Sequence, residues 1–515
     1  MTDASSPLIA WVPELIYQPS GFESGRALIS DAAGNIVRIE AVDQLSSERR
    51  INLPRRALLP GMVNAHSHAF QRVLRGRTEY RTMNQRDSFW TWRELMYSAA
   101  TRLTPEDIYD AARMAFLEMA LGGITAVGEF HYLHHAPDGL PYDDPNLLAK
   151  EVIRAAGDVG LRIALLRVAY ARSGFQTEAN PRQARFIEAD PATYLKNLDA
   201  LASSVRSPTV REGNARHSSA DEAAVALPDG RASDTAWIGM APHSVRAVPL
   251  DYLKVLIGYA NQRDLKVHMH VAEQPAEVSA CIEEYGRTPI ALLQTEGLLN
   301  KQFTAVHAIH VTPKAIASFA ETGATVCACP TTERNLGDGV IPADEYLKRG
   351  VPICLGTDSH AQIDLLEDAR ELEYHLRLQR LERAVLSVRS PTVREGSPRD
   401  SSAEQTAVAL PEGRAADTAR YLFNCATLDG ARSIGAPNGA LAAGMPADFF
   451  TVDLNDPAIA GASLDDLLPA IVFTASRAAI REVVIAGKPI VSEGQHLLQE
   501  EVVERFNELQ KRLWT

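Results

Sequence analysis

Positive charge and cysteine are both scarce in this sequence of 515 residues. Lys and Arg together number 52 against 65 Asp and Glu, so the formal net charge is −13. Nucleic acids and anionic membranes bind clustered positive charge, so neither is an expected partner. Five cysteines are too few for the disulfide framework of a small secreted protein, and we expect reduced, buried thiols.

Long apolar runs are missing as well. No stretch of about 18 apolar residues occurs, so the sequence predicts no membrane-spanning helix. Residues 1–18 lack the basic start and the apolar centre of a secretory signal, which favours a cytoplasmic location. With 46% hydrophobic and 23% charged residues, the chain has the composition of a soluble globular protein with a large core.

Short apolar segments alternate with longer amphipathic ones between residues 61 and 435. Such alternation predicts parallel strands joined by helices, and eight strand–helix units predict an α/β fold of the (β/α)8 TIM-barrel type. The expected barrel strands are residues 61–68, 124–132, 161–170, 237–244, 265–273, 303–311, 324–332 and 352–360.

The two ends of the chain have the short alternating patterns of strands and turns. We expect residues 1–60 and 436–515 to pair into one small β-sandwich domain beside the barrel. This places the barrel between two halves of a composite domain.

One segment of the barrel region occurs twice. Residues 204–236 recur as residues 387–419, and the copies differ at eight of 33 positions. Each copy is rich in Ser, Pro, Arg and acidic residues and has no helical or strand period, which predicts a disordered insertion in a surface connection. We expect both to lie on the barrel face opposite the active site, and a motif that docks a partner protein is the alternative.

Histidines and one aspartate stand at the ends of four predicted barrel strands. His66 and His68 end the first strand on one side of it, His270 ends the fifth, His307 lies on the sixth and Asp358 ends the eighth. The C-terminal ends of barrel strands converge on one face, where barrel enzymes carry their active sites. Imidazole and carboxylate ligands suit zinc. We therefore predict one Zn²⁺ per chain bound by His66, His68, His270 and Asp358, with Fe²⁺ as an alternative metal.

Three residues at the ends of the predicted strands, Glu273, His307 and Asp358, are candidates for catalysis. Glu273 follows His270 by three residues, so its carboxylate can carry a proton from the attacking water to the departing nitrogen. His307 can hydrogen-bond the attacking water or the tetrahedral intermediate. Asp358 can accept a proton in addition to binding the metal.

These motifs resemble the amidohydrolase superfamily in its mononuclear zinc deaminase branch. The shared pattern is H-x-H after the first strand, H-x-x-E after the fifth, His on the sixth and Asp-Ser after the eighth. Four segments are similar, more specifically, to the formimidoylglutamate deiminases: NAHSHAFQRVLRG (64–76), DSFWTWRELMY (87–97), APHSVRAVP (241–249) and CPTTERNLGDG (329–339). The resemblance covers nearly all of the chain outside the two repeats. It implies hydrolysis of N-formimidoyl-L-glutamate to N-formyl-L-glutamate and ammonia, in histidine degradation.

A substrate of this kind carries two carboxylates. The planar guanidinium of Arg matches a carboxylate in both charge and geometry. Arg246, in the loop after the fourth strand, and Arg93, after the first strand, are the candidates for these contacts. The resemblance further implies that Gln71, Tyr132 and His243 contact the substrate.

Two other functions are compatible with the same ligands. A zinc deaminase of guanine or a related ring would share every ligand but would not need two arginines. A barrel that has lost its activity would serve as a binding module. His131, His134 and His135 form a local run that imitates a second metal site, but no distant carboxylate accompanies it. The sequence leaves open whether the chain assembles into a homodimer.

Overall fold

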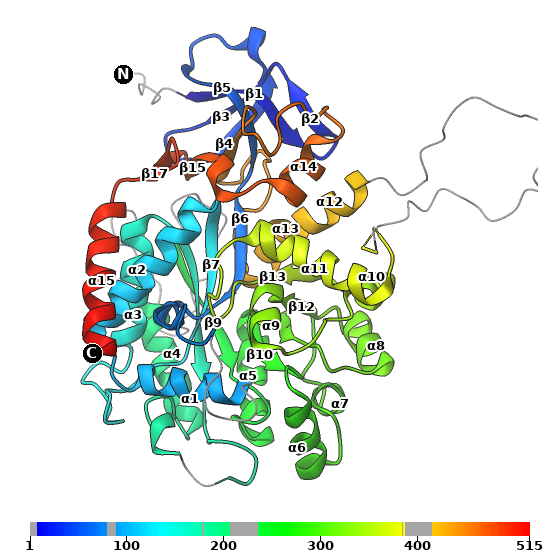
Figure 1. Ribbon diagram of the computed structural model, residues 1–515. Helices are drawn as coiled ribbons and strands as arrows, with labels where there is room; N and C mark the ends of the chain where they lie inside the picture. The colour runs from blue at the N-terminus through cyan, green and yellow to red at the C-terminus, as the bar shows by residue number, and fades with distance from the viewer. Residues whose placement is uncertain (1–7, 80–88, 178–179, 206–234, 384, 387–414) are drawn as a thin grey trace, which may run out of the picture.

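The computed structural model describes residues 8–79, 89–177, 180–205, 235–383, 385–386 and 415–515 (Figure 1). An eight-stranded sheet of parallel strands forms its centre, in the order in which the strands follow one another along the chain. Its strands are β6 (Met62–Ser67), β7 (Ile124–His131), β8 (Arg162–Ala169), β9 (Ala236–Pro242), β10 (Val267–Val271), β11 (Phe303–His307), β12 (Thr325–Ala328) and β13 (Ile353–Leu355).

The sheet closes into a barrel between its first and last strands. The backbone N–H of Asp358 donates to the carbonyl oxygen of His66 at 3.0 Å, and the N–H of His68 donates to the carbonyl oxygen of Asp358 at 3.1 Å. Each of the eight predicted strands corresponds to one observed strand. The prediction of a (β/α)8 barrel is therefore confirmed.

Helices follow the barrel strands and cover the outside of the sheet (Figure 1). Helix α2 illustrates their sequence signals, because Thr104 caps its start in a reciprocal pair of hydrogen bonds with Asp107 and Gly122 ends it. The helices of the barrel region are α1 (Phe89–Ala100), α2 (Pro105–Leu121), α3 (Leu147–Val159), α4 (Pro191–Val205), α5 (Leu250–Arg263), α6 (Pro275–Tyr285), α7 (Pro289–Thr295), α8 (Pro313–Thr322), α9 (Pro330–Leu336), α10 (Ala343–Lys348), α11 (Leu365–Arg380), α12 (Ala415–Cys425) and α13 (Leu428–Ile434).

Both ends of the chain contribute to one second sheet, as predicted. Strand β5, from the N-terminal part, pairs antiparallel with β14, from the C-terminal part, with Pro60 opposite Phe449. Most pairs in this sheet are antiparallel, and β1 and β5 are parallel. Its strands are β1 (Ile9–Gln18), β2 (Gly21–Ser24), β3 (Arg26–Ser30), β4 (Ile36–Ala41), β5 (Arg49–Pro60), β14 (Phe449–Asp453), β15 (Ile480–Ile485), β16 (Lys488–Ser492) and β17 (Gln495–His496).

Two C-terminal helices accompany this sheet, α14 (Leu467–Thr474) and α15 (Gln499–Trp514). Helix α15, red in Figure 1, lies beside α2 of the barrel. Glu501 and Arg505 of α15 form ion pairs with Arg113 at 2.6 Å and with Asp110 at 2.9 Å. The last helix therefore packs on the barrel, and the predicted domain boundaries stay a prediction.

Most of each repeat, residues 206–234 and 387–414, lies outside the described residues, so the predicted disorder stays a prediction. The described flanks give their place in the fold. The first repeat connects the end of α4 with the N-terminal end of β9, and the last residues of the second, 415–419, form the start of α12. The first repeat therefore leads into the N-terminal end of β9, whereas the predicted site lies at the C-terminal ends of the barrel strands.

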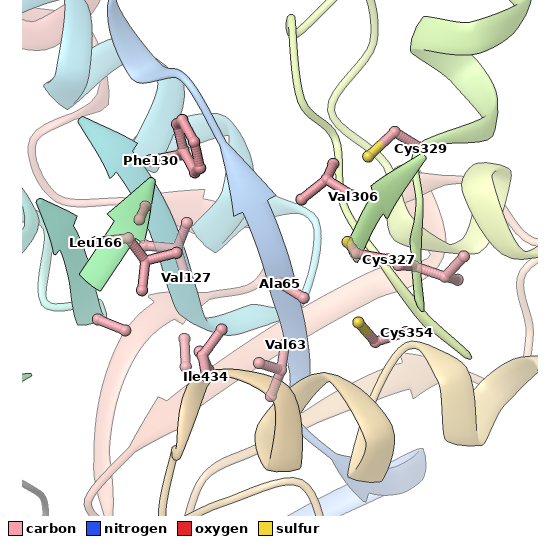
Figure 2. Close-up of a cluster of buried hydrophobic side chains, with 14 of the residues drawn as sticks. Val63, Ala65, Val127, Phe130, Leu166, Val306, Cys327, Cys329, Cys354 and Ile434 are labelled. Atoms are coloured by element: carbon pink, nitrogen blue, oxygen red, sulfur yellow. The ribbon is translucent and has the colours of Figure 1, made fainter. Parts of the chain in front are cut away.

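The barrel interior is filled by apolar side chains from neighbouring strands. Figure 2 shows Val63, Val127 and Phe130 pointing into this cluster, with Cys327 and Cys354 on the opposite side. All five cysteines are free and buried, as predicted. In the described part of the chain, no helix combines the length and the apolar character that crossing a membrane requires.

Candidate metal centre and active site

Four predicted ligands meet at the C-terminal end of the barrel. His66 and His68 come from the end of β6, His270 from β10 and Asp358 from the segment after β13. The Nε2 atom of His270 lies 3.2 Å from Nε2 of His66 and 3.3 Å from Nε2 of His68. The Oδ1 atom of Asp358 lies 3.3 Å from Nε2 of His66 and 3.2 Å from Nε2 of His68. The four ligand atoms thus form a compact cluster.

The spacing of these atoms fits a small divalent cation. Ligands at about 2.0–2.1 Å from a tetrahedral zinc ion lie roughly 3.3–3.4 Å from one another, close to the observed separations. Backbone carbonyl oxygens fix two of the rings, because Phe130 accepts from Nδ1 of His68 at 2.9 Å and His243 accepts from Nδ1 of His270 at 3.1 Å. Each Nε2 then presents its lone pair to the cluster.

The charge states of the cluster also suit metal binding. Burial lowers the pKa of His66 to about 3 and that of His270 well below its ordinary value, so both imidazoles are neutral. Burial raises the pKa of the Asp358 carboxyl, but hydrogen bonds with His66 and His68 hold it well below its ordinary range. Neutral imidazole and ionised carboxylate are the forms that bind a metal ion.

The backbone around the cluster adopts an unusual conformation. Five non-glycine residues at or just after the ends of β10, β11 and β13 have positive φ angles, which L-residues rarely adopt. They are Ala272 (53°), His307 (69°), Ala308 (49°), Asp358 (44°) and His360 (59°). Such strain concentrates at functional sites, where the surrounding structure holds side chains in fixed directions.

Glu273 and His307 lie beside the metal cluster. The Nε2 atom of His307 is 3.7 Å from Oε1 of Glu273 and 3.8 Å from Oδ2 of Asp358. Burial raises the pKa of Glu273 to about 7, which lets the carboxyl both take and release a proton near neutral pH. Burial lowers the pKa of His307, but the carboxylates of Glu273, Asp358 and Glu333 raise it to about 10.

One pocket joins the metal cluster to every predicted substrate contact. Its walls include Gln71, Arg93, Tyr132, His243 and Arg246 together with Glu273, His307 and the ligands His68, His270 and Asp358. Gln71 donates to the hydroxyl oxygen of Tyr132 at 2.8 Å. The structure therefore brings together all of the residues that the sequence assigned to the site.

Neither pocket arginine has a carboxylate partner in the described part of the chain. The guanidinium of Arg93 stacks on the ring of Trp90 at 4.4 Å, and its Nε atom is buried without a hydrogen-bond partner among the described residues. Arg246 donates to the hydroxyl of Tyr170 at 3.4 Å and to the carbonyl oxygen of Ser173 at 3.3 Å. Two half-buried positive charges that form no ion pair among the described residues make this end of the pocket attractive to an anion, although the carboxylate of Glu277 lies next to Arg246.

Several pocket residues were not predicted. Tyr97 and Tyr170 line the pocket, and Gln183 binds both of their hydroxyl groups from behind. Glu277 lines it next to Arg246 and accepts the N–H of Glu273 at 3.1 Å. Glu333 lies 3.3 Å from Nδ1 of His307. Glu333 and Tyr97 lie in two of the segments that carried the family resemblance, 329–339 and 87–97, and this resemblance was the only sequence signal for any of these residues.

The local histidine run after β7 is not a metal site. Nε2 of His134 donates to the carbonyl oxygen of Val168 at 2.8 Å, and Nε2 of His135 donates to that of Ile187 at 3.0 Å. Among the described residues, the groups that could hold a metal do not include either histidine or His131. The side chains of His134 and His135 therefore hold neighbouring backbone segments in place.

Comparison with known proteins agrees with this geometry. Residues 57–490 match the amidohydrolase family. The chain is 36% identical over 451 residues to a formimidoylglutamate deiminase of Pseudomonas aeruginosa, covering 87% of this chain and 88% of that protein. It is 24% identical to a 5-methylthioadenosine/S-adenosylhomocysteine deaminase of Haloarcula marismortui, covering 94% and 91% of the two chains.

A solved structure shows the same fold over the whole chain. The crystal structure of an amidohydrolase from Brucella melitensis superimposes with a TM-score of 0.81 and 32% identity, covering 99% of this chain and all of that one. The family match spans both the metal cluster and the pocket that extends from it. On this evidence the chain is a member of the amidohydrolase family, and it is a hydrolase that acts on carbon–nitrogen bonds.

Proposed function

We propose that this protein hydrolyses N-formimidoyl-L-glutamate to N-formyl-L-glutamate and ammonia, with one Zn²⁺ per chain, as a cytoplasmic step of histidine degradation. The observation that carries the proposal is the pair Arg93 and Arg246, two guanidinium groups without carboxylate partners among the described residues, in the same pocket as the metal cluster. The pocket thus has a metal end and an arginine end. A substrate that carries an amidine and two carboxylates can place the amidine at the metal end and the carboxylates at the arginine end.

The reaction adds water to the amidine carbon and releases its terminal nitrogen. A divalent metal ion bound by His66, His68, His270 and Asp358 supplies Lewis acidity, which makes water more acidic and the amidine carbon more electrophilic. Glu273 takes one proton from the water and delivers it to the terminal nitrogen of the amidine. The hydroxyl proton of the tetrahedral intermediate then passes through the carboxylate of Glu273 or Asp358 to the same nitrogen, which leaves as ammonia. The carbon that bore this nitrogen becomes the formyl group.

His307 stabilises the negative charge that develops on oxygen. Its Nδ1 faces Glu333, so its Nε2–H is directed into the pocket near Glu273 and Asp358. A donor fixed in this way before the reaction stabilises the tetrahedral intermediate without reorganisation. Arg93 and Arg246 hold the carboxylates and keep the amidine carbon beside Glu273.

A purine deaminase is the weaker alternative. A neutral flat ring carries no carboxylate, so it would leave both half-buried guanidinium groups without the ion pairs that a dicarboxylate offers them. An inactive binding module is also disfavoured, because Glu273, His307 and all four ligands are present and close together.

Ammonia release from three compounds tests the proposal. We expect turnover of N-formimidoyl-L-glutamate by the metal-loaded protein and slower turnover of N-formimidoylglycine, which lacks one carboxylate. Loss of one hydrogen bond to a charged group costs about 1.5–3 kcal/mol, so kcat/KM should fall roughly 10- to 150-fold. Turnover of guanine with none of the amidine would contradict the proposal.

A further inference from the structure

Two tyrosine hydroxyl groups in the pocket are held by one buried amide. Gln183 donates from Nε2 to the hydroxyl oxygen of Tyr97 at 2.7 Å and to that of Tyr170 at 2.6 Å. Tyr97 belongs to α1, Tyr170 follows β8, and Gln183 ends the short 3-10 helix Pro181–Gln183. All three side chains are almost fully buried. One amide therefore fixes the hydroxyl groups of two separate segments.

The direction of these hydrogen bonds leaves hydroxyl hydrogens for another acceptor. An amide nitrogen only donates, so each phenol oxygen accepts a hydrogen bond from Gln183. Arg246 is also only a donor and binds the Tyr170 oxygen at 3.4 Å. No hydrogen bond donated by the Tyr170 hydroxyl is found in the described part of the chain. The Tyr97 hydroxyl is likewise not found donating to any acceptor among the described residues, so a ligand in the pocket can accept from both phenols.

The two hydroxyl groups lie at the arginine end of the pocket. Tyr97 and Tyr170 line the pocket, and Gln183 lies behind them. The ring of His243 lies 4.6 Å from that of Tyr170 and 4.9 Å from that of His270, so one aromatic ring separates this phenol from a metal ligand. A ligand that accepts these hydrogen bonds can therefore extend from the metal centre along His243.

We propose that Tyr97 and Tyr170 donate hydrogen bonds to a substrate carboxylate and that Gln183 is the positioning residue that keeps their hydrogens turned toward the pocket. The choice of a dicarboxylate rests on the proposed function. Arg93 and Arg246 supply charge, and the phenols add fixed directional donors beside them. These donors stand at a fixed distance from the metal cluster. They therefore favour substrates in which the amidine and the carboxylate are separated by the matching distance.

Four variants separate this role from a structural one. Tyr97→Phe and Tyr170→Phe remove only the hydroxyl groups. Gln183→Met removes the amide at similar size, and Gln183→Glu replaces the donor by an acceptor that captures both hydroxyl hydrogens. Tyr194→Phe is the matched control, because the buried Tyr194 hydroxyl donates to the carbonyl oxygen of Arg167 at 2.6 Å and does not line the pocket.

The readouts are KM and kcat for N-formimidoyl-L-glutamate and the Kd of glutarate, a plain dicarboxylate, for the metal-loaded protein by calorimetry. We expect Tyr170→Phe to raise KM and the glutarate Kd roughly 10- to 150-fold, with kcat within about threefold of the parent. Tyr97→Phe should raise both in the same direction. Gln183→Glu should weaken binding more than Gln183→Met, because its carboxylate also repels the ligand. Tyr194→Phe should change neither constant.

Unchanged KM and Kd in both phenylalanine variants would overturn the inference, as would a Gln183→Glu protein that binds as well as Gln183→Met. A lower melting temperature with unchanged Kd would assign the three residues a purely structural role. If the parent protein does not turn over N-formimidoyl-L-glutamate, the proposed function fails. Glutarate binding then tests the inference about the two phenols on its own. Weaker binding in the phenol variants would support the inference, and absent or unaltered binding would overturn it.

Discussion

The carboxylate oxygen Oε1 of Glu333 lies 3.3 Å from Nδ1 of His307 and also accepts the backbone N–H of Cys329 at 2.9 Å. This contact orients His307 from the side remote from the pocket. Glu333 therefore acts on the reaction through His307, and a substitution of Glu333 tests this role.

Replacing Glu333 by Gln should reduce turnover without emptying the metal site. The amide keeps the size of the side chain but loses the charge that stabilises a protonated imidazole. A hydrogen bond to a charged group is worth about 1.5–3 kcal/mol, so kcat should fall roughly 10- to 150-fold. Metal content should match that of the parent, and the exposed Glu321→Gln variant serves as the control. A Glu333→Gln enzyme with full activity would show that His307 needs no such partner.

Glu273→Gln should separate proton transfer from metal binding. The variant cannot take a proton from water, and general acid–base catalysis contributes about 10²–10⁴-fold, so kcat should fall by at least that range. Its metal content, measured by elemental analysis, should stay near that of the parent. His270→Ala should instead lose the metal and the activity together. Loss of metal from Glu273→Gln, or its full activity, would show that this carboxylate has another role.

Arg246→Lys and Arg93→Lys should weaken substrate binding although they keep the positive charge. Lysine lacks the two-pronged geometry of a guanidinium, so we expect KM to rise roughly tenfold or more, in the range for a lost charged hydrogen bond. Arg334→Lys is the matched control, because Arg334 pairs with Glu371 outside the pocket. Equal KM values in all three variants would argue against recognition of a dicarboxylate.

Removal of the metal should lower both activity and stability. A bound ion stabilises only the folded protein, by about 4 kcal/mol when its concentration is 1,000 times the Kd. We expect a chelator to abolish ammonia release and to lower the melting temperature, and one equivalent of Zn²⁺ per chain to restore both. A requirement for two equivalents would contradict the single four-ligand cluster.

The two repeats should be dispensable for the reaction. The first is joined to β9 at the end of the strand opposite the metal cluster, and the second leads into α12, whose residues are not among those that line the pocket. Replacing residues 206–234 and 387–414 by short Gly/Ser linkers should leave kcat/KM within about threefold of the parent. A folded variant that has lost its metal or its activity would place the repeats in a functional role.

The metal ligands could be predicted from the sequence because all four stand at or just after the ends of barrel strands, namely β6, β10 and β13. Alternation along β6 turns His66 and His68 to one side, and barrel closure brings the strand ends together. Gln183 and Tyr97 could not be predicted in the same way. Tyr97 belongs to α1 and Gln183 to the short 3-10 helix Pro181–Gln183. The placement of these elements beside the pocket depends on packing that no periodicity in the sequence reports.

The most direct test of the reaction is the identity of its products. Hydrolysis that expels the terminal nitrogen of N-formimidoyl-L-glutamate gives N-formyl-L-glutamate and ammonia, whereas cleavage of the other carbon–nitrogen bond of the amidine gives formamide and L-glutamate. We expect NMR of the metal-loaded protein with this substrate to show N-formyl-L-glutamate, with one ammonium ion for each substrate consumed. Formamide and L-glutamate, or unchanged substrate, would contradict the proposed function.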